Sequence, residues 1–210
     1  MIDLYYWTTP NGHKVSIFME EAGIDYKIVP VNITKGEQMK EDYLKISPNN
    51  KIPAIVDHNA ATPLALFESG AILLYLARKT GKFLPHHHEN EARINQWLFW
   101  QVGGLGPMSG QAMHFKVFAK EQIPYAIDRY VDEVKRLYKV MDKELTHHRF
   151  LGGDEYSIAD MATYPWVEPH EKLGISLKEW PALDRWVKTI ADRPAVKKAY
   201  AIAKEINEGA

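Results

Sequence analysis

The chain has 210 residues, and none of them is cysteine. This absence excludes disulfide bonds, thiolate zinc and iron–sulfur sites, a cysteine nucleophile and a Cys-x-x-Cys redox centre carried by the protein. If the protein carries out sulfur chemistry, the sulfur must therefore arrive on a ligand.

An excess of charge of one sign is also missing, because 26 lysines and arginines stand against 27 aspartates and glutamates. Such a balance predicts no binding to nucleic acid or to an anionic membrane surface. The N-terminus has no basic stretch followed by a long apolar run, and no apolar segment approaches the roughly 20 residues that a membrane helix needs. We therefore expect a cytoplasmic protein.

Hydrophobic residues make up 46% of the chain, which is ordinary for a globular protein with a real core. Up to residue 81 the pattern predicts the order βαβ-α-ββα. The predicted strands are 2–7, 26–31, 53–56 and 64–67. The first predicted helix ends at Gly23, the second covers 38–46 and the third covers 69–80. From residue 90 onward only helical patterns follow, most clearly over 123–145. The fold class is thus α/β plus all-α: a mixed domain over 1–81, a linker over 82–89 and an α-helical domain over 90–210.

Thr9 and Asn11 lie where the first predicted strand passes into the first helix. A helix N-terminus presents unpaired N–H groups and a partial positive charge, which favour an anion such as a thiolate. Short side-chain donors there can lower the pKa of a bound thiol. The alternative is simple helix capping, in which Thr and Asn are also favoured.

Pro53 stands at the mouth of the third predicted strand. A proline belongs at a strand start because it has no N–H to donate, and it is a candidate for a cis bond, although only about one X–Pro bond in twenty is cis. A cis turn would leave the N–H and C=O of Ile52 facing outward, free to pair with an extended peptide. An ordinary trans proline is the alternative.

Glu68 and Ser69 end the last predicted strand and open the next helix. Ser69 is a candidate N-cap whose hydroxyl and following amides could hold a carboxylate, and Glu68 could hold an ammonium group. Together they would grip an α-amino acid. A serine cap beside an acidic residue is also common helix stabilisation.

Other motifs favour structural roles. Adjacent histidines at 86–88 cannot easily converge on one ion, so we expect a solvated loop and no metal. Ser157 and Asp160 have capping-box spacing. Arg129, surrounded by acidic residues, belongs by default to a solvated charged face.

Three segments occur in the order typical of one family: Asn50-Lys51-Ile52-Pro53-Ala54, Phe67-Glu68-Ser69-Gly70-Ala71-Ile72 and Ser157-Ile158-Ala159-Asp160. With them the whole chain resembles a glutathione transferase, which implies a thioredoxin-like N-terminal domain and a C-terminal α-helical bundle. Residues 9–14, 46–58 and 97–108 resemble more narrowly the bacterial nu class of glutathione-dependent disulfide-bond oxidoreductases. That class is also similar to the globular domain of the fungal nitrogen-regulator prion.

The resemblance implies that Thr9 and Asn11 hold the glutathione sulfur and are the catalytic residues. Tyr5 and Tyr6 are reserves, since other transferase classes use a tyrosine near the end of the first strand. The resemblance also implies a set of glutathione-binding residues. Gln38 would contact the glycyl end, and Lys51, Ile52 and cis-Pro53 the cysteinyl unit. Glu68 and Ser69 would bind the γ-glutamyl ammonium and carboxylate, and Arg129 would act within or across the subunits of a homodimer.

By this resemblance, bound glutathione is the co-substrate, and its thiolate attacks a small disulfide or a hydroperoxide. Two alternatives stay open. One is a transferase that conjugates glutathione to electrophilic xenobiotics, and the other is a non-catalytic regulatory protein with a transferase fold. The non-catalytic alternative is less favoured because the sequence keeps the residues of the implied glutathione site, namely Thr9, Asn11, Glu68 and Ser69.

Overall fold

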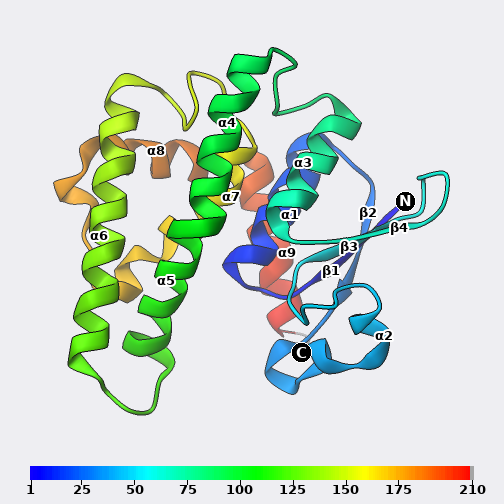
Figure 1. Ribbon diagram of the computed structural model, residues 1–210, viewed down its shortest axis with the longest axis horizontal. Coiled ribbons are helices and arrows are strands. Elements are labelled where there is room, and N and C mark those ends of the chain that lie inside the picture. The colour runs from blue at the N-terminus through cyan, green and yellow to red at the C-terminus, as the bar shows by residue number, and fades with distance from the viewer. Residues whose placement is uncertain (209–210) are drawn as a thin grey trace. The chain divides into compact units, whose positions relative to one another are not determined.

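A computed structural model describes residues 1–208 (Figure 1). The strands are β1 (Ile2–Tyr6), β2 (Tyr26–Pro30), β3 (Ala54–Asp57) and β4 (Leu64–Phe67). The α-helices are α1 (Pro10–Ala22), α2 (Glu41–Leu44), α3 (Ser69–Thr80), α4 (His88–Trp100), α5 (Gly106–Met113), α6 (Pro124–His147), α7 (Ile158–Val167), α8 (Pro181–Ala191) and α9 (Pro194–Glu208). The chain divides into two compact units, Met1–Lys82 with the segment from Asp192 onward, and Phe83–Ala191.

The first unit is built on a four-stranded sheet with the order β2-β1-β3-β4. Strand β1 runs parallel to β2 and antiparallel to β3, which is antiparallel to β4. Leu4 at the centre of β1 pairs with Ile28 and Ile55, and both Leu4 and Ile55 are fully buried. Helices α1 and α3 pack on each other, and α3 also contacts β3 and β4 (Figure 1). The predicted thioredoxin-like order of elements is thereby confirmed.

Helix α9 belongs to this first unit, although the sequence pattern assigns it to the α-helical domain over 90–210. It packs on α1 through a buried face of Val196, Ala199 and Ala203, which recur three or four residues apart. Two ion pairs, Arg193 with Glu21 and Lys198 with Glu20, connect it to the end of α1. An amphipathic pattern shows that a helix has a buried face but not which unit covers it. The expected linker over 82–89 is also shorter, because α4 begins at His88.

The second unit is helical, with α7 at its core. The predicted capping box at the start of α7 is confirmed: the Ser157 hydroxyl accepts from an amide of the first turn, and the Asp160 carboxylate accepts from the Ser157 N–H at 3.0 Å. Asp160 also accepts from the Leu151 N–H at 2.9 Å and from the Trp186 indole at 2.8 Å. One buried carboxylate thus connects α7 to a preceding loop and to α8.

Glycines interrupt the long helical path of this unit between α4 and α6. Residues Gln101–Leu105 form a π-helical turn, η3, before α5. A Cβ on Gly106 would lie 2.7 Å from Nε2 of Gln101, and one on Gly110 would lie 3.4 Å from the Trp166 ring of α7. The Trp166 ring of α7 therefore lies against α5 at Gly110, whereas a Cβ on Gly103 or Gly104 would meet nothing within 4 Å among the described residues. Among residues 1–208, no helix is long and apolar enough to span a membrane.

Candidate functional site

The ends of three strands bring the predicted residues of the first unit to one end of the sheet. Tyr5, near the end of β1, pairs with Ala54, the first residue of β3, and Ala54 pairs with Phe67, the last residue of β4. The start of α1, the segment before β3 and the start of α3 therefore lie at the same sheet edge. Residues that are far apart in the chain become neighbours through strand register.

Gly12 allows the first turn of α1 to pack closely on the end of β1. A Cβ at this position would lie 2.3 Å from the carbonyl oxygen of Trp7 and 2.9 Å from the Tyr6 ring. Backbone cannot yield to such a contact, so a side chain at residue 12 would push the helix start away. Thr9 is the N-cap of this helix, and Asn11 lies half-buried in its first turn.

The Thr9 hydroxyl does not cap α1. Its backbone has the extended conformation of an N-cap, but its side chain makes no capping hydrogen bond. Oγ1 is buried and has no hydrogen-bond partner within residues 1–208. Leaving a buried hydroxyl unpaired costs stability, typically about 1–3 kcal/mol. The capping alternative is therefore wrong for this hydroxyl.

Tyr6, held in reserve for the same role, is already engaged. Its hydroxyl forms a hydrogen bond of 3.0 Å with Nδ1 of His13. Burial raises the pKa of Tyr6 far above that of a free tyrosine and lowers the pKa of His13 to about 4. Burial likewise raises the pKa of Tyr5, with the charge of Asp3 adding to the effect. The Tyr6 hydroxyl is therefore already engaged by His13 within the first unit.

The segment before β3 is fixed through the carbonyl oxygen of Lys51. This oxygen accepts from the Tyr43 hydroxyl at 2.6 Å and from the Ser47 hydroxyl at 2.8 Å. The Ile52–Pro53 peptide bond is cis, as the sequence allowed. Within residues 1–208, neither the N–H nor the C=O of Ile52 forms a hydrogen bond. The backbone of Ile52 is thus held from one side and available to an extended ligand, while the Lys51 side chain is exposed.

Gln38 is carried by a short 3-10 turn, η2 (Glu37–Met39). The single helix predicted over 38–46 is wrong, because Lys40 has extended backbone angles and separates η2 from α2. Gln38 is half-buried, and its Oε1 atom is buried without a hydrogen-bond partner in the described part of the chain. The Gln38 oxygen shares this property with the Thr9 hydroxyl.

At the start of α3 the backbone departs from ordinary geometry. Glu68 has φ 70° and ψ 111°, a conformation that side chains other than glycine rarely adopt. Such strain is typical of functional sites. Glu68 is the N-cap, so the prediction that Ser69 caps α3 is wrong: Ser69 is the first helical residue. Its hydroxyl instead accepts a hydrogen bond of 3.2 Å from the Lys14 ammonium.

Lys14 is a site residue that the sequence interpretation missed. Its side chain is only 2% exposed, within α1. Burial lowers its pKa to about 7, and the nearby charge of Glu68 partly opposes this shift. Lysines are almost never fully buried unless they are paired. Its spacing in the sequence could have predicted this burial, because Lys14 lies four residues before the buried Phe18 and therefore on the same face of the helix.

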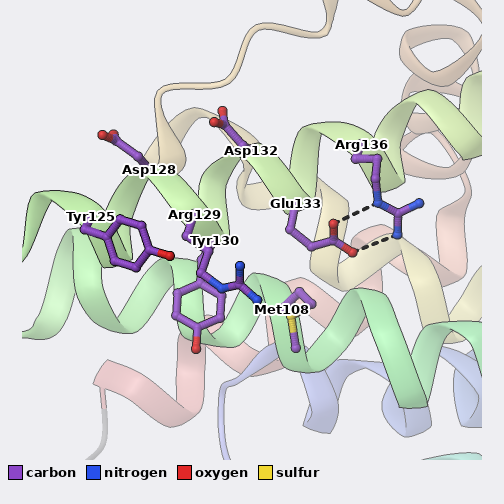
Figure 2. A pocket seen from close by; sticks show the side chains of 8 residues that line it. All are labelled: Met108, Tyr125, Asp128, Arg129, Tyr130, Asp132, Glu133 and Arg136. Atoms are coloured by element: carbon purple, nitrogen blue, oxygen red, sulfur yellow. Dashed lines mark hydrogen bonds and ion pairs between the residues drawn. The ribbon is translucent and has the colours of Figure 1, made fainter.

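Arg129 lies in the second unit, on the exposed side of α6. It lines a cavity of about 700 Å³ that also includes Met108 of α5 (Figure 2). The other lining residues are Tyr125, Asp128, Tyr130, Asp132, Glu133 and Arg136. Arg136 pairs with Glu133 through bonds of 2.7 and 2.8 Å, and the pKa of Glu133 is lowered by Arg136 first and by Arg129 after it. Arg129 thus faces a polar concavity and not a flat charged surface.

Residues 1–208 contain no group of three or more histidines, aspartates or glutamates arranged to hold a metal ion. Of the three adjacent histidines, His87 pairs with Glu89 at the surface, and His88 opens α4.

Both units match one family. Residues 2–78 match the family described as glutathione S-transferase, N-terminal domain, and residues 107–194 match glutathione S-transferase, C-terminal domain. The chain belongs to the glutathione transferase family. The family and the fold class predicted from the sequence are thereby confirmed, as is the prediction of a transferase-like enzyme.

Relatives of this transferase are similar over nearly its whole length. The chain is 55% identical over 207 residues to the disulfide-bond oxidoreductase YfcG of Escherichia coli K12, covering 97% of this chain and 96% of the relative. A glutathione transferase family member from Pseudomonas fluorescens Pf-5, solved with two glutathione molecules bound, is 42% identical with a TM-score of 0.89 and covers 94% of this chain and 91% of that one. A glutathione transferase from Pseudomonas putida, solved with one glutathione disulfide per subunit, is 40% identical with a TM-score of 0.88 and covers 94% and 90%.

Proposed function

We propose that this transferase is a glutathione-dependent disulfide reductase in which bound glutathione supplies the attacking thiolate. The observation that carries the proposal is the convergence of three segments at one sheet edge, each suited to a different part of the tripeptide. They are the start of α1, the backbone at Ile52 and the start of α3. Relatives solved with glutathione or its disulfide bound support the choice of ligand.

The start of α3 suits the γ-glutamyl end. The Glu68 carboxylate would bind the ammonium group, and the Ser69 hydroxyl with the first amides of α3 would bind the carboxylate. The Ile52 N–H and C=O would pair with the cysteinyl unit as an added strand, with the Lys51 side chain nearby. Gln38 would contact the glycyl end.

The start of α1 suits the sulfur. A thiolate placed there would be stabilised by the positive end of the helix dipole and by donors on Thr9 and Asn11. The buried and unpaired Oγ1 of Thr9 supports this placement. Because the chain has no cysteine, the glutathione thiol is the one sulfur nucleophile that the proposed reaction has.

The reaction balances without a protein thiol. The glutathione thiolate attacks one sulfur of a substrate disulfide, forms a mixed disulfide and releases a substrate thiolate, which takes up a proton. A second glutathione attacks the mixed disulfide and releases the other substrate thiol. Two glutathione thiols are oxidised to one glutathione disulfide, and one substrate disulfide is reduced to two thiols. With a hydroperoxide, the same thiolate would take the outer oxygen as a sulfenic acid and release an alcohol, and a second glutathione would then release water.

Support for the disulfide reaction over conjugation comes from the 55% identical relative that is named a disulfide-bond oxidoreductase. Assignment to the nu class, a homodimer and a glutathione contact by Arg129 are further proposals that rest on the resemblance in sequence. A cytoplasmic location is proposed from the sequence pattern of the N-terminus and the shortness of the apolar segments. Sedimentation of the purified protein tests the dimer, and Arg129→Ala tests the contact through the KM for glutathione.

A coupled assay tests the proposed function. Glutathione, a small disulfide, glutathione reductase and NADPH are combined with the wild type, Thr9→Ala or Asn11→Ala, and conjugation of chlorodinitrobenzene is measured in parallel. We expect rapid disulfide turnover by the wild type and large losses in both variants. Strong conjugation with negligible disulfide turnover would favour the conjugating transferase. No glutathione binding by calorimetry would contradict both enzymatic functions and favour a regulatory protein.

A further inference from the structure

Lys14 has no role in the reaction described above, yet it is the most unusual charged group of the first unit. Its side chain is 2% exposed, and its ammonium group lies 3.2 Å from the Ser69 hydroxyl oxygen. Burying the charge of a lysine costs free energy, so we expect a buried lysine to have a functional role.

We propose that Lys14 is a positioning residue for the γ-glutamyl carboxylate of glutathione, and that its protonated form orients the Ser69 hydroxyl and supplies the buried positive charge that the bound carboxylate requires. This inference rests on the proposed function, because it assigns a further residue to the same glutathione site. Lys14 acts through Ser69 and is not itself assigned a contact with the reacting sulfur.

The geometry of the hydrogen bond gives Ser69 its direction. The Lys14 ammonium can only donate, so the Ser69 oxygen accepts from it. The single hydrogen of the hydroxyl is then free to point toward an acceptor on the ligand, as a carboxylate oxygen would be. The first amides of α3 are further donors at the same helix start, since a helix leaves its first N–H groups unpaired within itself. A carboxylate at this position would therefore meet donors that the lysine has oriented.

The charge balance of the clamp also favours a cation beneath Ser69. Glutathione would bring both an ammonium and a carboxylate to the start of α3, whereas Glu68 alone matches only the ammonium. Lys14, whose pKa is influenced by the charge of Glu68, completes a pair of opposite charges that matches the ligand. The arrangement predicts recognition of the whole α-amino acid unit and not of its ammonium alone.

Other charged groups near Lys14 do not take over this role. On its own helix, burial lowers the pKa of His13 to about 4, so this ring stays neutral above pH 6. The lysines of α9 have other partners: Lys197 pairs with Asp192, Lys198 with Glu20 and Lys204 with Glu208. Arg193, which directly precedes α9, pairs with Glu21. On α3, Lys79 pairs with Asp57, and Arg78 lies beside it in the last turn. Glu68 is the charged side chain that acts on Lys14.

A protonation step follows from this arrangement. Burial lowers the pKa of Lys14 to about 7, so part of the free protein carries a neutral lysine above neutral pH. A bound carboxylate favours the ammonium form, so ligand binding above pH 7 must bring a proton into the site. The affinity for the ligand is then expected to weaken as the pH rises.

Calorimetry with S-methylglutathione tests the inference, because this probe keeps the γ-glutamyl unit and has no thiol to titrate. At pH 8, measurements in buffers of different ionisation enthalpy should show an uptake of about half a proton to one proton per ligand by the wild type. The affinity should weaken about tenfold between pH 7 and 9. The α-amino group of the ligand also titrates in this range, so the uptake that belongs to Lys14 is the difference between the wild type and Lys14→Met.

Variants provide the second arm. Lys14→Met should raise the Kd for S-methylglutathione at pH 6.5 by about tenfold or more. It should also remove the part of the proton uptake and of the pH dependence that Lys14 contributes. Lys14→Arg should restore binding without proton uptake if the larger group is accommodated. Lys27→Met, which removes an exposed lysine of β2, is the control and should match the wild type.

The outcomes separate the two proposals. Binding of S-methylglutathione by the wild type without proton uptake, or unchanged affinity in a folded Lys14→Met at pH 6.5, would overturn the role of Lys14 and leave the proposed function standing. No binding of S-methylglutathione by the wild type at any pH would overturn both.

Discussion

The hydroxyl of Tyr43 donates a hydrogen bond of 2.6 Å to the carbonyl oxygen of Lys51. Tyr43 is a buried residue of α2, and Lys51 directly precedes Ile52, whose backbone is proposed to pair with glutathione. The short helix α2 thus holds the backbone segment that directly precedes Ile52.

Tyr43→Phe is predicted to weaken glutathione binding. The variant keeps the packing of the ring but removes one of the two donors to the Lys51 oxygen, so the KM for glutathione should rise several-fold with a smaller change in kcat. The free energy of unfolding should fall by about 1 kcal/mol. Tyr75→Phe is the matched control, because its hydroxyl donates to Asp57 and not to the segment before Ile52. An equal rise in KM in both variants would contradict the prediction.

Thr9→Val is predicted to separate activity from stability. Removing the hydroxyl should reduce kcat for disulfide reduction by about 10- to 1000-fold if it stabilises the thiolate. Stability should be unchanged or slightly higher, since the buried oxygen has no partner within residues 1–208.

Thr163→Val serves as the comparison for Thr9→Val. The Thr163 hydroxyl is buried in the second unit and donates to the Ala159 carbonyl oxygen at 2.7 Å. Urea denaturation should show a loss of stability for Thr163→Val with activity retained, the reverse of Thr9→Val. A stability loss in Thr9→Val as large as that in Thr163→Val would indicate a structural role for the Thr9 hydroxyl.

Lys14→Met is predicted to change how stability depends on pH. The pKa of Lys14 is about 7 in the folded protein, against 10.5 for an ordinary lysine, so the unfolded chain binds more protons between these values. The burial penalty is fully present below pH 7 and disappears as the pH rises toward 10.5. Relative to the wild type, the variant should gain most stability at pH 6 and progressively less at pH 8 and 9.5. Urea denaturation at these pH values checks the trend, and a difference that is constant with pH would refute it.

Asp160→Ala is predicted to destabilise the second unit. Burial raises the pKa of this carboxyl to about 6 although the Trp186 indole, two N–H groups and a hydroxyl donate to it. Removing the acceptor leaves these buried donors unpaired, and the free energy of unfolding should fall by about 3 kcal/mol or more. Asp184→Ala, which breaks a surface pair with Lys188, should change stability by less than about 1 kcal/mol. Similar losses in the two variants would argue against a central role for Asp160.

Local chemistry made part of the fold predictable from the sequence. Helix α3 spans Ser69–Thr80 and β4 spans Leu64–Phe67, both as the apolar spacing predicts. Gly23 adopts the left-handed conformation expected of a residue that ends a helix. These features depend on residues close together in the chain, where spacing and capping preferences act directly.

Features that depend on distant contacts could not be read in the same way. Lys14 of α1 meets Ser69 of α3 although 55 residues separate them, and α9 packs on α1 from the other end of the chain. The position of the Thr9 hydroxyl depends on how closely Gly12 lets α1 approach Trp7. In each case the sequence names the residue, but only the tertiary structure shows what it touches.

The central claim is that the protein activates the thiol of glutathione in place of a thiol of its own. The most direct measurement is an ultraviolet titration of the thiolate of glutathione bound to the wild type, with Thr9→Val alongside. We predict that the pKa of the bound thiol lies at least about one unit below that of an ordinary thiol, near 8.5, and moves back toward that value in Thr9→Val. A bound thiol that titrates like free glutathione in the wild type would contradict the account.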